Sequence, residues 1–119
     1  MDLKISKVQK VGKENSEFVR LSVENDCELG EYLIADSTYT NPGQISNKLR
    51  HVYWFPDQKV KKGDTVFLVT GKGTNSIKEN GSNTIYQFHW NLNEGVWNDD
   101  GDVAVLFHEK EWEFTKSEK

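Results

Sequence analysis

The sequence has 119 residues, of which 35% are hydrophobic, and this is enough for one domain with a single core rather than a disordered chain. Its formal net charge of −4, with acidic and basic residues interspersed, argues against bulk affinity for nucleic-acid backbones. The single cysteine, Cys27, excludes an internal disulfide, and no stretch resembles a signal peptide or a membrane span. We therefore expect one domain over residues 1–119, located in the cytoplasm and without membrane insertion.

The N-terminal third of the chain predicts short strands. Leu3 and Ile5 share one face and Val8 follows after a shift of phase, which indicates a strand with a bulge. Residues 17–24 alternate between apolar and polar side chains, as a half-buried strand does, and residues 32–35 predict a third short strand.

Residues 36–50 contain an Asn-Pro-Gly turn and show no sustained period. We expect this stretch to be the longest irregular connection, and 39–49 to be the first place to look for a binding surface. The alternative is a flexible insertion without a function.

The middle of the chain alternates strands and polar turns. Residues 51–55 are dense in β-formers and end at Pro56, and Lys62-Gly63-Asp64 predicts a turn. Residues 65–70 are nearly all apolar, which favours a central strand that is buried on both sides or lies at a crossing of sheets. Residues 71–83 predict a long polar loop, and 84–90 resume the alternation, with Ile85 facing away from Tyr86 and Phe88.

The C-terminal third joins the turn of residues 98–101 to an apolar strand over 102–107. Trp112 and Phe114 then predict one face of a last strand. No segment of ten residues has a helical period, so the sequence predicts about eight short strands in an antiparallel sandwich or barrel.

These elements, in this order, resemble the lamin tail domain family. The segments that carry the resemblance are Glu17-Phe18-Val19-Arg20-Leu21, Gly30-Glu31-Tyr32-Leu33-Ile34-Ala35-Asp36, Tyr53 to Phe55, Lys62-Gly63-Asp64-Thr65-Val66-Phe67-Leu68, Gly71-Lys72-Gly73-Thr74-Asn75 and, most specifically, Trp97-Asn98-Asp99-Asp100-Gly101-Asp102-Val103-Ala104-Val105-Leu106. The chain departs from the family pattern in the longer stretch 36–50 and in His108-Glu109-Lys110-Glu111, where the family usually has a glycine.

The resemblance implies an immunoglobulin-like antiparallel β-sandwich that acts as a non-catalytic interaction module, without a cofactor and with a protein partner. Its structural signature here comprises Trp97, Asn98, Gly101, Asp102, Val105 and Leu106. Fold alone does not determine function, so this functional step is an analogy.

Four tryptophans supply an alternative function. If Trp54 or Trp112 were exposed beside Tyr39 or Tyr53, the rings would form a flat platform of the kind that stacks on sugars or anchors protein partners. The alternative is therefore a carbohydrate-binding β-sandwich that uses exposed aromatic residues.

Other candidate sites are explained better by structural roles. His51, His89 and His108 lack the short spacing of zinc ligands. The acidic cluster Asp99, Asp100 and Asp102 lacks the spacing of a calcium loop and suits a turn. We therefore expect neither a metal nor a cofactor.

The remaining motifs do not indicate an enzyme. The loop Gly71-Lys72-Gly73-Thr74 has no Walker spacing, and Cys27 lies in no triad or elbow motif. The basic run Lys59-Val60-Lys61-Lys62 is typical of a solvated edge, and only non-specific nucleic-acid binding would follow from it.

Overall fold

The computed structural model describes residues 1–9, 17–41, 44–45, 48–97 and 102–118 of the chain, and within them the fold is all-β. One short 3₁₀ turn, η1 (Leu29–Glu31), is the helical element of the described residues. The strands are β1 (Leu3–Gln9), β2 (Phe18–Val23), β3 (Cys27–Glu28), β4 (Tyr32–Asn41), β5 (Gln44–Ile45), β6 (Val52–Trp54), β7 (Lys59–Val60), β8 (Thr65–Val69), β9 (Ser76–Asn80), β10 (Asn83–His89) and β11 (Asp102–His108). The expected all-β class is confirmed.

The larger sheet has the strand order β1-β2-β8-β10-β9. In β2 the apolar residues Val19, Leu21 and Val23 are buried while Arg20 is exposed, as the alternation predicts. The register of β1 against β2 shifts between Ile5 and Lys7, which confirms the predicted bulge. Strand β8 occupies the predicted central position, but it alternates between buried and half-buried residues and is not buried on both sides.

One pairing in this sheet contradicts the prediction of a purely antiparallel arrangement, because β10 runs parallel to β8. The cause lies in residues 71–83, which were expected to form a polar loop. They instead contain β9, which pairs antiparallel with β10 through a turn at Gly81 and Ser82. This hairpin folds back so that β10 lies between β8 and β9.

The smaller sheet has the order β11-β4-β5, and β6 also pairs with β4. The expectation that strand structure stops at Ala35 and that residues 36–50 are irregular is wrong. Strand β4 continues to Asn41, and β11 pairs with it from Asp102, opposite Thr38, to His108, opposite Tyr32.

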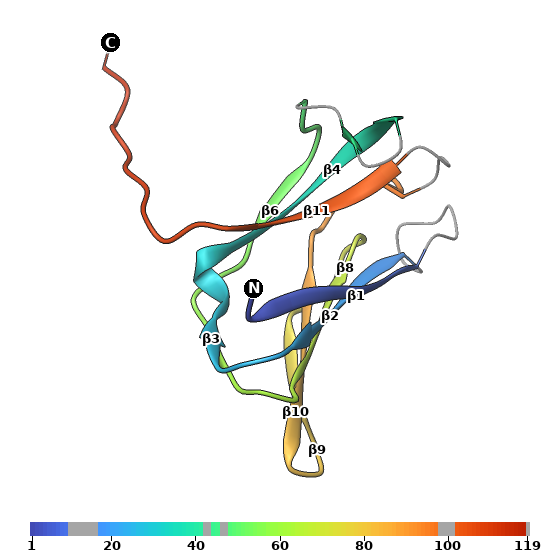
Figure 1. The fold of residues 1–119 in the computed structure, drawn as a ribbon, viewed down its shortest axis with the longest axis vertical. Helices are drawn as coiled ribbons and strands as arrows, with labels where there is room; N and C mark the ends of the chain where they lie inside the picture. The colour runs from blue at the N-terminus through green and yellow to red at the C-terminus, as the bar shows by residue number, and fades with distance from the viewer. Residues whose placement is uncertain (10–16, 42–43, 46–47, 98–101, 119) are drawn as a thin grey trace.

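The buried apolar side chains of the described residues form one core cluster between the two sheets. Its buried side chains come from both, for example Leu21 of β2, Val66 of β8 and Ile34 of β4, and Trp97 joins them from the segment before β11. Figure 1 shows β4 and β11 side by side in one layer and β1 and β2 in the other. The pair β3 and β7 forms a separate small sheet near η1.

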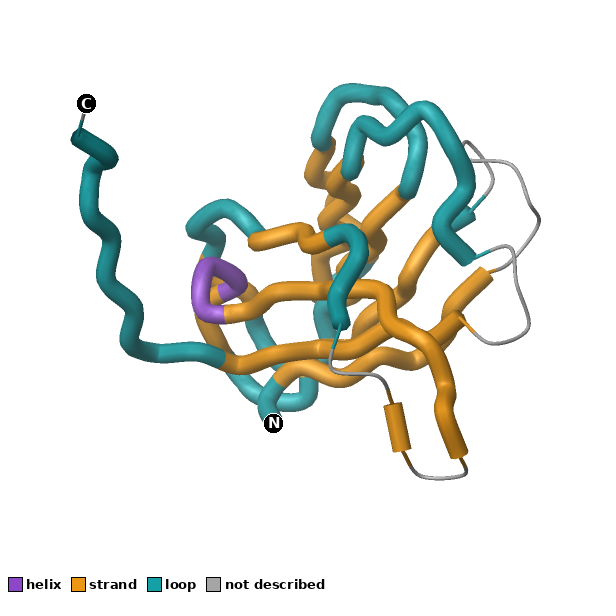
Figure 2. The backbone as a smooth tube through the Cα atoms, turned by 90° about the horizontal axis from the view of Figure 1, so that it is seen from above, coloured by secondary structure: helices purple, strands orange, loops and turns teal. Residues whose placement is uncertain are grey.

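The C-terminal residues 109–118, which we call the tail, contradict the prediction of a last strand. They are exposed and carry no strand assignment in the structure. Figures 1 and 2 both show this segment leaving the end of β11 and projecting away from the sheets.

Candidate functional site

Two of the four tryptophans, Trp54 and Trp112, lie side by side at the surface. Trp54 ends β6 and faces outward, and its indole nitrogen donates a hydrogen bond of 2.7 Å to the carbonyl oxygen of Gly30. Trp112 comes from the tail, and its ring lies 5.1 Å from that of Trp54, with the planes at 88°. The two residues, 49% and 55% exposed, therefore form a corner, which we call the tryptophan corner.

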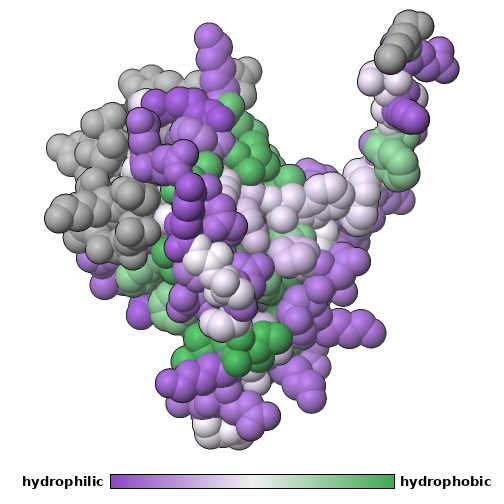
Figure 3. All heavy atoms as spheres, turned by 180° about the vertical axis from the view of Figure 1, so that it is seen from behind, coloured by the Kyte–Doolittle hydropathy of each residue, from purple (hydrophilic) through white to green (hydrophobic). Residues whose placement is uncertain are grey.

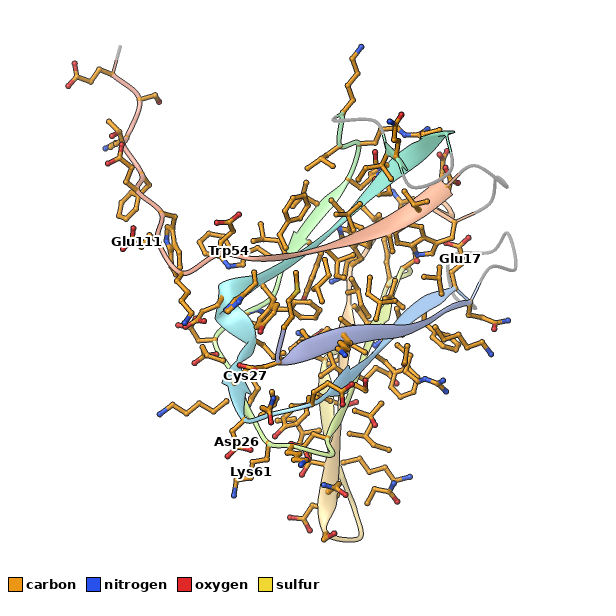
Figure 4. The ribbon with its side chains drawn as sticks, viewed as in Figure 1. Glu17, Asp26, Cys27, Trp54, Lys61 and Glu111 are labelled. Carbon is orange, nitrogen blue, oxygen red and sulfur yellow. The ribbon has the colours of Figure 1, made fainter. Side chains whose placement is uncertain are left out.

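The tryptophan corner borders a pocket of about 440 Å³. Leu33 of β4 and Phe114 of the tail add apolar walls. Its lining is completed by the three carboxylate residues Glu109, Glu111 and Glu113. Figure 4 shows Trp54 and Glu111 near the point where the tail leaves the sheet. The pocket therefore combines two indole rings, two further apolar side chains and three acidic groups.

The root of the tail is held by contacts with η1 and the start of β4. The imidazole of His108 stacks on the ring of Tyr32 with centroids 4.4 Å apart, and its Nε2 lies 2.8 Å from a carboxylate oxygen of Glu31. The amide of Glu109 donates a hydrogen bond of 2.7 Å to the carbonyl oxygen of Glu31. These contacts fix the place at which the tail starts.

The pocket continues into the outward face of the smaller sheet. In β11, Ala104 and Leu106 pack against the core, so Val105 and Phe107 point to the opposite face. Cross-strand partners share a face, and Phe107 opposes Leu33, which in turn opposes Trp54. The next row on this face comprises Val105 and the exposed Val52, with Ala35 fully buried between them. Both rows consist of apolar residues.

Figure 3 shows the face opposite to that of Figure 1, where hydrophilic atoms dominate and hydrophobic atoms surface at the β9–β10 end. Ile77 of β9 is 63% exposed. Hydrophobic atoms also interrupt the otherwise hydrophilic tail, in which Phe114 is 92% exposed.

Apart from this pocket, a polar cluster lies on the inner side of the smaller sheet, where two carboxylates are almost fully buried. The side chains of Asp36 and Asp102 are only 3% and 5% exposed. Arg50 bridges them, with Nη2 3.2 Å from Asp102 and Nε 3.7 Å from Asp36. The amide of His51 donates a hydrogen bond of 2.6 Å to Asp36. Because each carboxylate has a partner, this cluster anchors residues 50–51 to β4 and β11.

The residues of the predicted signature have different positions. Trp97 is buried in the core, Leu106 packs against it, and Val105 faces outward. Asp102 belongs to the buried carboxylate cluster. Asn98 and Gly101 lie outside the described residues.

Glu17 connects the first and last motifs of the sequence. It is fully buried, and its carboxylate accepts hydrogen bonds from the amides of Val96, at 2.8 Å, and Trp97, at 3.3 Å. Gly95 leaves room for this carboxylate, since a Cβ at that position would lie 2.8 Å from Glu17 Oε2. Glu17 therefore fastens the segment before β11 to the start of β2.

Of the four aromatic residues predicted for a binding surface, the structure brings Trp54 and Trp112 together. Tyr53 points to the other side of β6, where its ring contacts Phe55 and Trp90, and burial raises its pKa. The side chain of Tyr39 lies outside the described residues. Tyr53 therefore does not extend the surface that Trp54 and Trp112 form.

Sequence reasoning missed the carboxylates and Leu33 as parts of this site. In an extended chain, the alternation over 109–114 puts the three glutamates on one face and Trp112 and Phe114 on the other. The sequence therefore gives no signal that both sets border one pocket, as they do in the structure. No sequence signal places Leu33 next to Trp54, since their contact depends on the pairing of β4 with β6.

The other candidate groups do not gather into a chemical site. Within the described residues no three His, Cys, Asp or Glu side chains are placed to hold a metal ion, and Asp99 and Asp100 lie outside those residues. Burial, with the nearby carboxylates of Asp2 and Glu31 in addition, raises the pKa of Cys27 to about 11. Its thiol is therefore protonated at neutral pH and is a poor nucleophile.

The basic run and the glycine loop also have local roles. Lys61 and Lys62 are exposed, and their amides donate hydrogen bonds to Asp64 and Asp26. The amide of Gly73 donates to the side chain of Asn91 at 3.1 Å, which holds the loop after β8 against the end of β10. No helix in the described part of the chain is long and apolar enough to cross a membrane.

Comparison of the chain with protein-family models and with curated protein sequences finds no match.

Proposed function

We propose that this chain is a non-catalytic interaction module that binds a protein partner, built on an immunoglobulin-like β-sandwich of the lamin tail type. The observation that carries the proposal is the tryptophan corner together with the apolar outward face of β11, β4 and β6. Large exposed aromatic residues next to an apolar patch mark binding surfaces on soluble proteins.

The proposed fold draws support from the arrangement of the motifs. The two sheets enclose one core cluster, and Glu17 of the first motif bonds to Trp97 of the last. The parallel pairing of β8 and β10 departs from a purely antiparallel sandwich, so the proposal concerns the two-sheet arrangement and its motif contacts.

The absence of catalysis is likewise a proposal. It is supported by the raised pKa of the Cys27 thiol and by the partners of the buried carboxylates Asp36 and Asp102, which already engage Arg50. In this arrangement the thiol is protonated and both carboxylates are engaged, so none of the three is positioned to act on a substrate. A protein partner is favoured over nucleic acid by the net charge of −4. A cytoplasmic location stays a prediction.

Carbohydrate binding is the alternative, favoured by the exposure of Trp54 and Trp112. Sugar rings stack best on an open aromatic face, whereas the edge-to-face contact at 88° occupies one face of this pair. A shift of the tryptophan fluorescence on addition of polysaccharides, abolished by Trp112→Ala, would favour this alternative.

The proposed function is tested by affinity capture from a lysate of the source cell, with mass spectrometry of the retained proteins. The bait is the full chain, and a second bait carries Ile77→Ala, which alters an exposed apolar residue on β9 away from the tryptophan corner. We expect both baits to retain the same protein. Return of the bait alone would contradict a stable protein partner.

A further inference from the structure

The two indole rings of the tryptophan corner present a geometry suited to a rounded cation. The face of an aromatic ring is electron-rich and attracts a positive charge within about 6 Å of the ring centroid. Because the two planes meet at 88° with centroids 5.1 Å apart, they form two walls rather than one surface. A planar ligand fills only one wall of such a corner, whereas a rounded group can contact both.

The acidic groups of the pocket favour a ligand with a positive charge. Glu109, Glu111 and Glu113 line it, and none of the ion pairs that the structure describes involves them. Lys110 lies between Glu109 and Glu111 in the chain but does not line the pocket, so acidic residues outnumber basic ones there. This excess gives a negative potential where the indole faces also favour a cation. An anionic ligand would be repelled by these groups.

The apolar walls distinguish between kinds of cation. A lysine ammonium is compact and strongly hydrated, so contact with Leu33 and Phe114 would cost it hydration. An arginine guanidinium is planar and stacks along a single ring. A trimethylammonium group is rounded, keeps its charge and presents methyl groups to apolar walls. We propose that the tryptophan corner binds a trimethylammonium group, carried on a trimethylated lysine side chain of a protein partner.

The protein origin of this group is inferred from the surface next to the pocket, and it rests on the proposed function. The row Phe107, Leu33 and Trp54 leads from the pocket across the outward face, and the row Val105, Ala35 and Val52 follows it. A peptide inserting its modified lysine can lay neighbouring apolar side chains along these rows. A small free cation would use the pocket alone.

The direct test measures binding of a short labelled peptide, containing one trimethyl-lysine flanked by valines, by fluorescence anisotropy with the full chain. Controls are the same peptide with unmodified lysine and with the neutral carbon isostere, in which a tert-butyl group replaces the trimethylammonium. We expect the trimethylated peptide to bind roughly tenfold or more tightly than either control. Equal binding of the neutral isostere would overturn the role of the positive charge.

Variants of the chain assign the binding to the pocket. Trp112→Ala removes one wall and is expected to weaken binding roughly tenfold, and Glu111→Gln should weaken it severalfold and reduce its dependence on salt. Ile77→Ala is the matched control, because Ile77 is a large exposed apolar residue elsewhere, and it should leave the affinity unchanged. Since Trp112 and Glu111 are exposed tail residues, these variants keep the core intact. Unchanged binding by Trp112→Ala would overturn the proposed site.

Two further measurements separate this inference from the proposed function. Choline, added as a competitor, should displace the peptide only at much higher concentration, and equal affinity of choline would overturn the protein origin. In the capture experiment, a Trp112→Ala bait should lose the partner. If this bait still retained the same partner, the chain would remain an interaction module. The proposal that the tryptophan corner binds the partner's trimethyl-lysine would then be wrong.

Discussion

At the scale of single residues, Glu17 is the group whose chemistry the fold depends on most clearly. Its carboxylate accepts hydrogen bonds from the buried amides of Val96 and Trp97. Glu17→Ala leaves both amides without an acceptor and opens a cavity, and we expect the free energy of unfolding to fall by about 2–4 kcal/mol. Glu17→Gln keeps one acceptor oxygen and should cost less. Urea denaturation measures both changes.

The control for this prediction is Glu24→Gln. Glu24 forms a surface ion pair with Lys4 at 3.8 Å, and both side chains are largely exposed. Such pairs contribute about 0–1 kcal/mol, so this variant should unfold close to the urea concentration of the parent protein. If Glu17→Ala were no more destabilising than Glu24→Gln, the fastening role of Glu17 would be wrong.

The Cys27 thiol yields a prediction about reactivity. Its pKa is raised from 9.0 to about 11, chiefly by burial. At pH 8 the thiolate fraction is then lower than that of an unperturbed thiol by a factor of roughly 100, and alkylation is slowed accordingly. We expect iodoacetamide to modify the folded protein far more slowly than the urea-unfolded protein at the same pH, as mass spectrometry of the intact chain can follow.

The same shift affects stability at alkaline pH. A group whose pKa is higher in the folded state holds its proton longer there, so stability is intact below pH 9 and falls as the pH rises toward 11. Cys27→Ala should flatten this part of the profile, as measured by chemical denaturation at several pH values. An identical slope in the variant would show that the thiol makes no contribution.

At the scale of elements, two turn glycines differ in their surroundings. Replacing each by alanine separates the free-energy cost of backbone strain from the cost of steric crowding. Gly63 has φ +93° in the turn before β8, and a Cβ there would lie 2.6 Å from the side chain of Asn83. Gly81, with φ +65° in the β9–β10 turn, has open space around the same position. Gly81→Ala should therefore cost only the backbone strain, about 1 kcal/mol.

Gly63→Ala should cost more, about 2–3 kcal/mol, because it adds displacement of the Asn83 amide, which bonds to the Lys62 carbonyl. Comparison of the two unfolding midpoints tests this difference. A larger loss for Gly81→Ala than for Gly63→Ala would contradict the crowding seen at Gly63.

The strands that the sequence predicts well are those with a clear apolar face. In β2 and β10 the alternation decides which residues are buried, since Leu21 and Tyr86 meet the same core. The second half of β4 has no such pattern, because Asp36 and Ser37 are buried polar residues. Their partners, Arg50 and the Lys48 carbonyl, lie in another segment, and a single-sequence pattern cannot reveal them.

The sequence pattern also fails where a strand forms, or does not form, because of its pairing with a neighbouring strand. Strand β9 is exposed throughout and exists through its backbone pairing with β10. The tail has the alternation of a strand, yet the described structure provides it with no pairing partner. Side-chain periodicity therefore reports burial, whereas pairing depends on the arrangement of the whole sheet.

At the scale of the whole molecule, the candidate site is assembled from three separate parts of the chain. Leu33 comes from β4, Trp54 from β6 and Trp112 from the tail. The sequence predicted the two tryptophans as members of a binding surface, but their edge-to-face contact requires the tail to leave β11 over the end of β6. The acidic lining follows from the same path of the tail.

This assembly predicts that the tail serves the site and not the stability of the domain. Its residues are exposed, and its root is already fixed by the contacts of His108 and Glu109 with η1. Deletion of residues 110–119 removes the contact of Trp112 with Trp54, and we expect the free energy of unfolding to fall by less than about 1 kcal/mol. Amide NMR shifts should change around Gly30, Leu33 and Trp54 and remain elsewhere.

The matched control is a longer deletion, from residue 102 onward, which also removes β11. Ala104 and Leu106 pack against the core, and β11 supplies the pairing for seven residues of β4, from Tyr32 to Thr38. Loss of this strand exposes both the core and the backbone of β4, so the protein should lose its cooperative unfolding transition. A tail deletion as damaging as the loss of β11 would mean that residues 110–119 belong to the folded domain, and the pocket would then be part of its core structure rather than a separate binding feature.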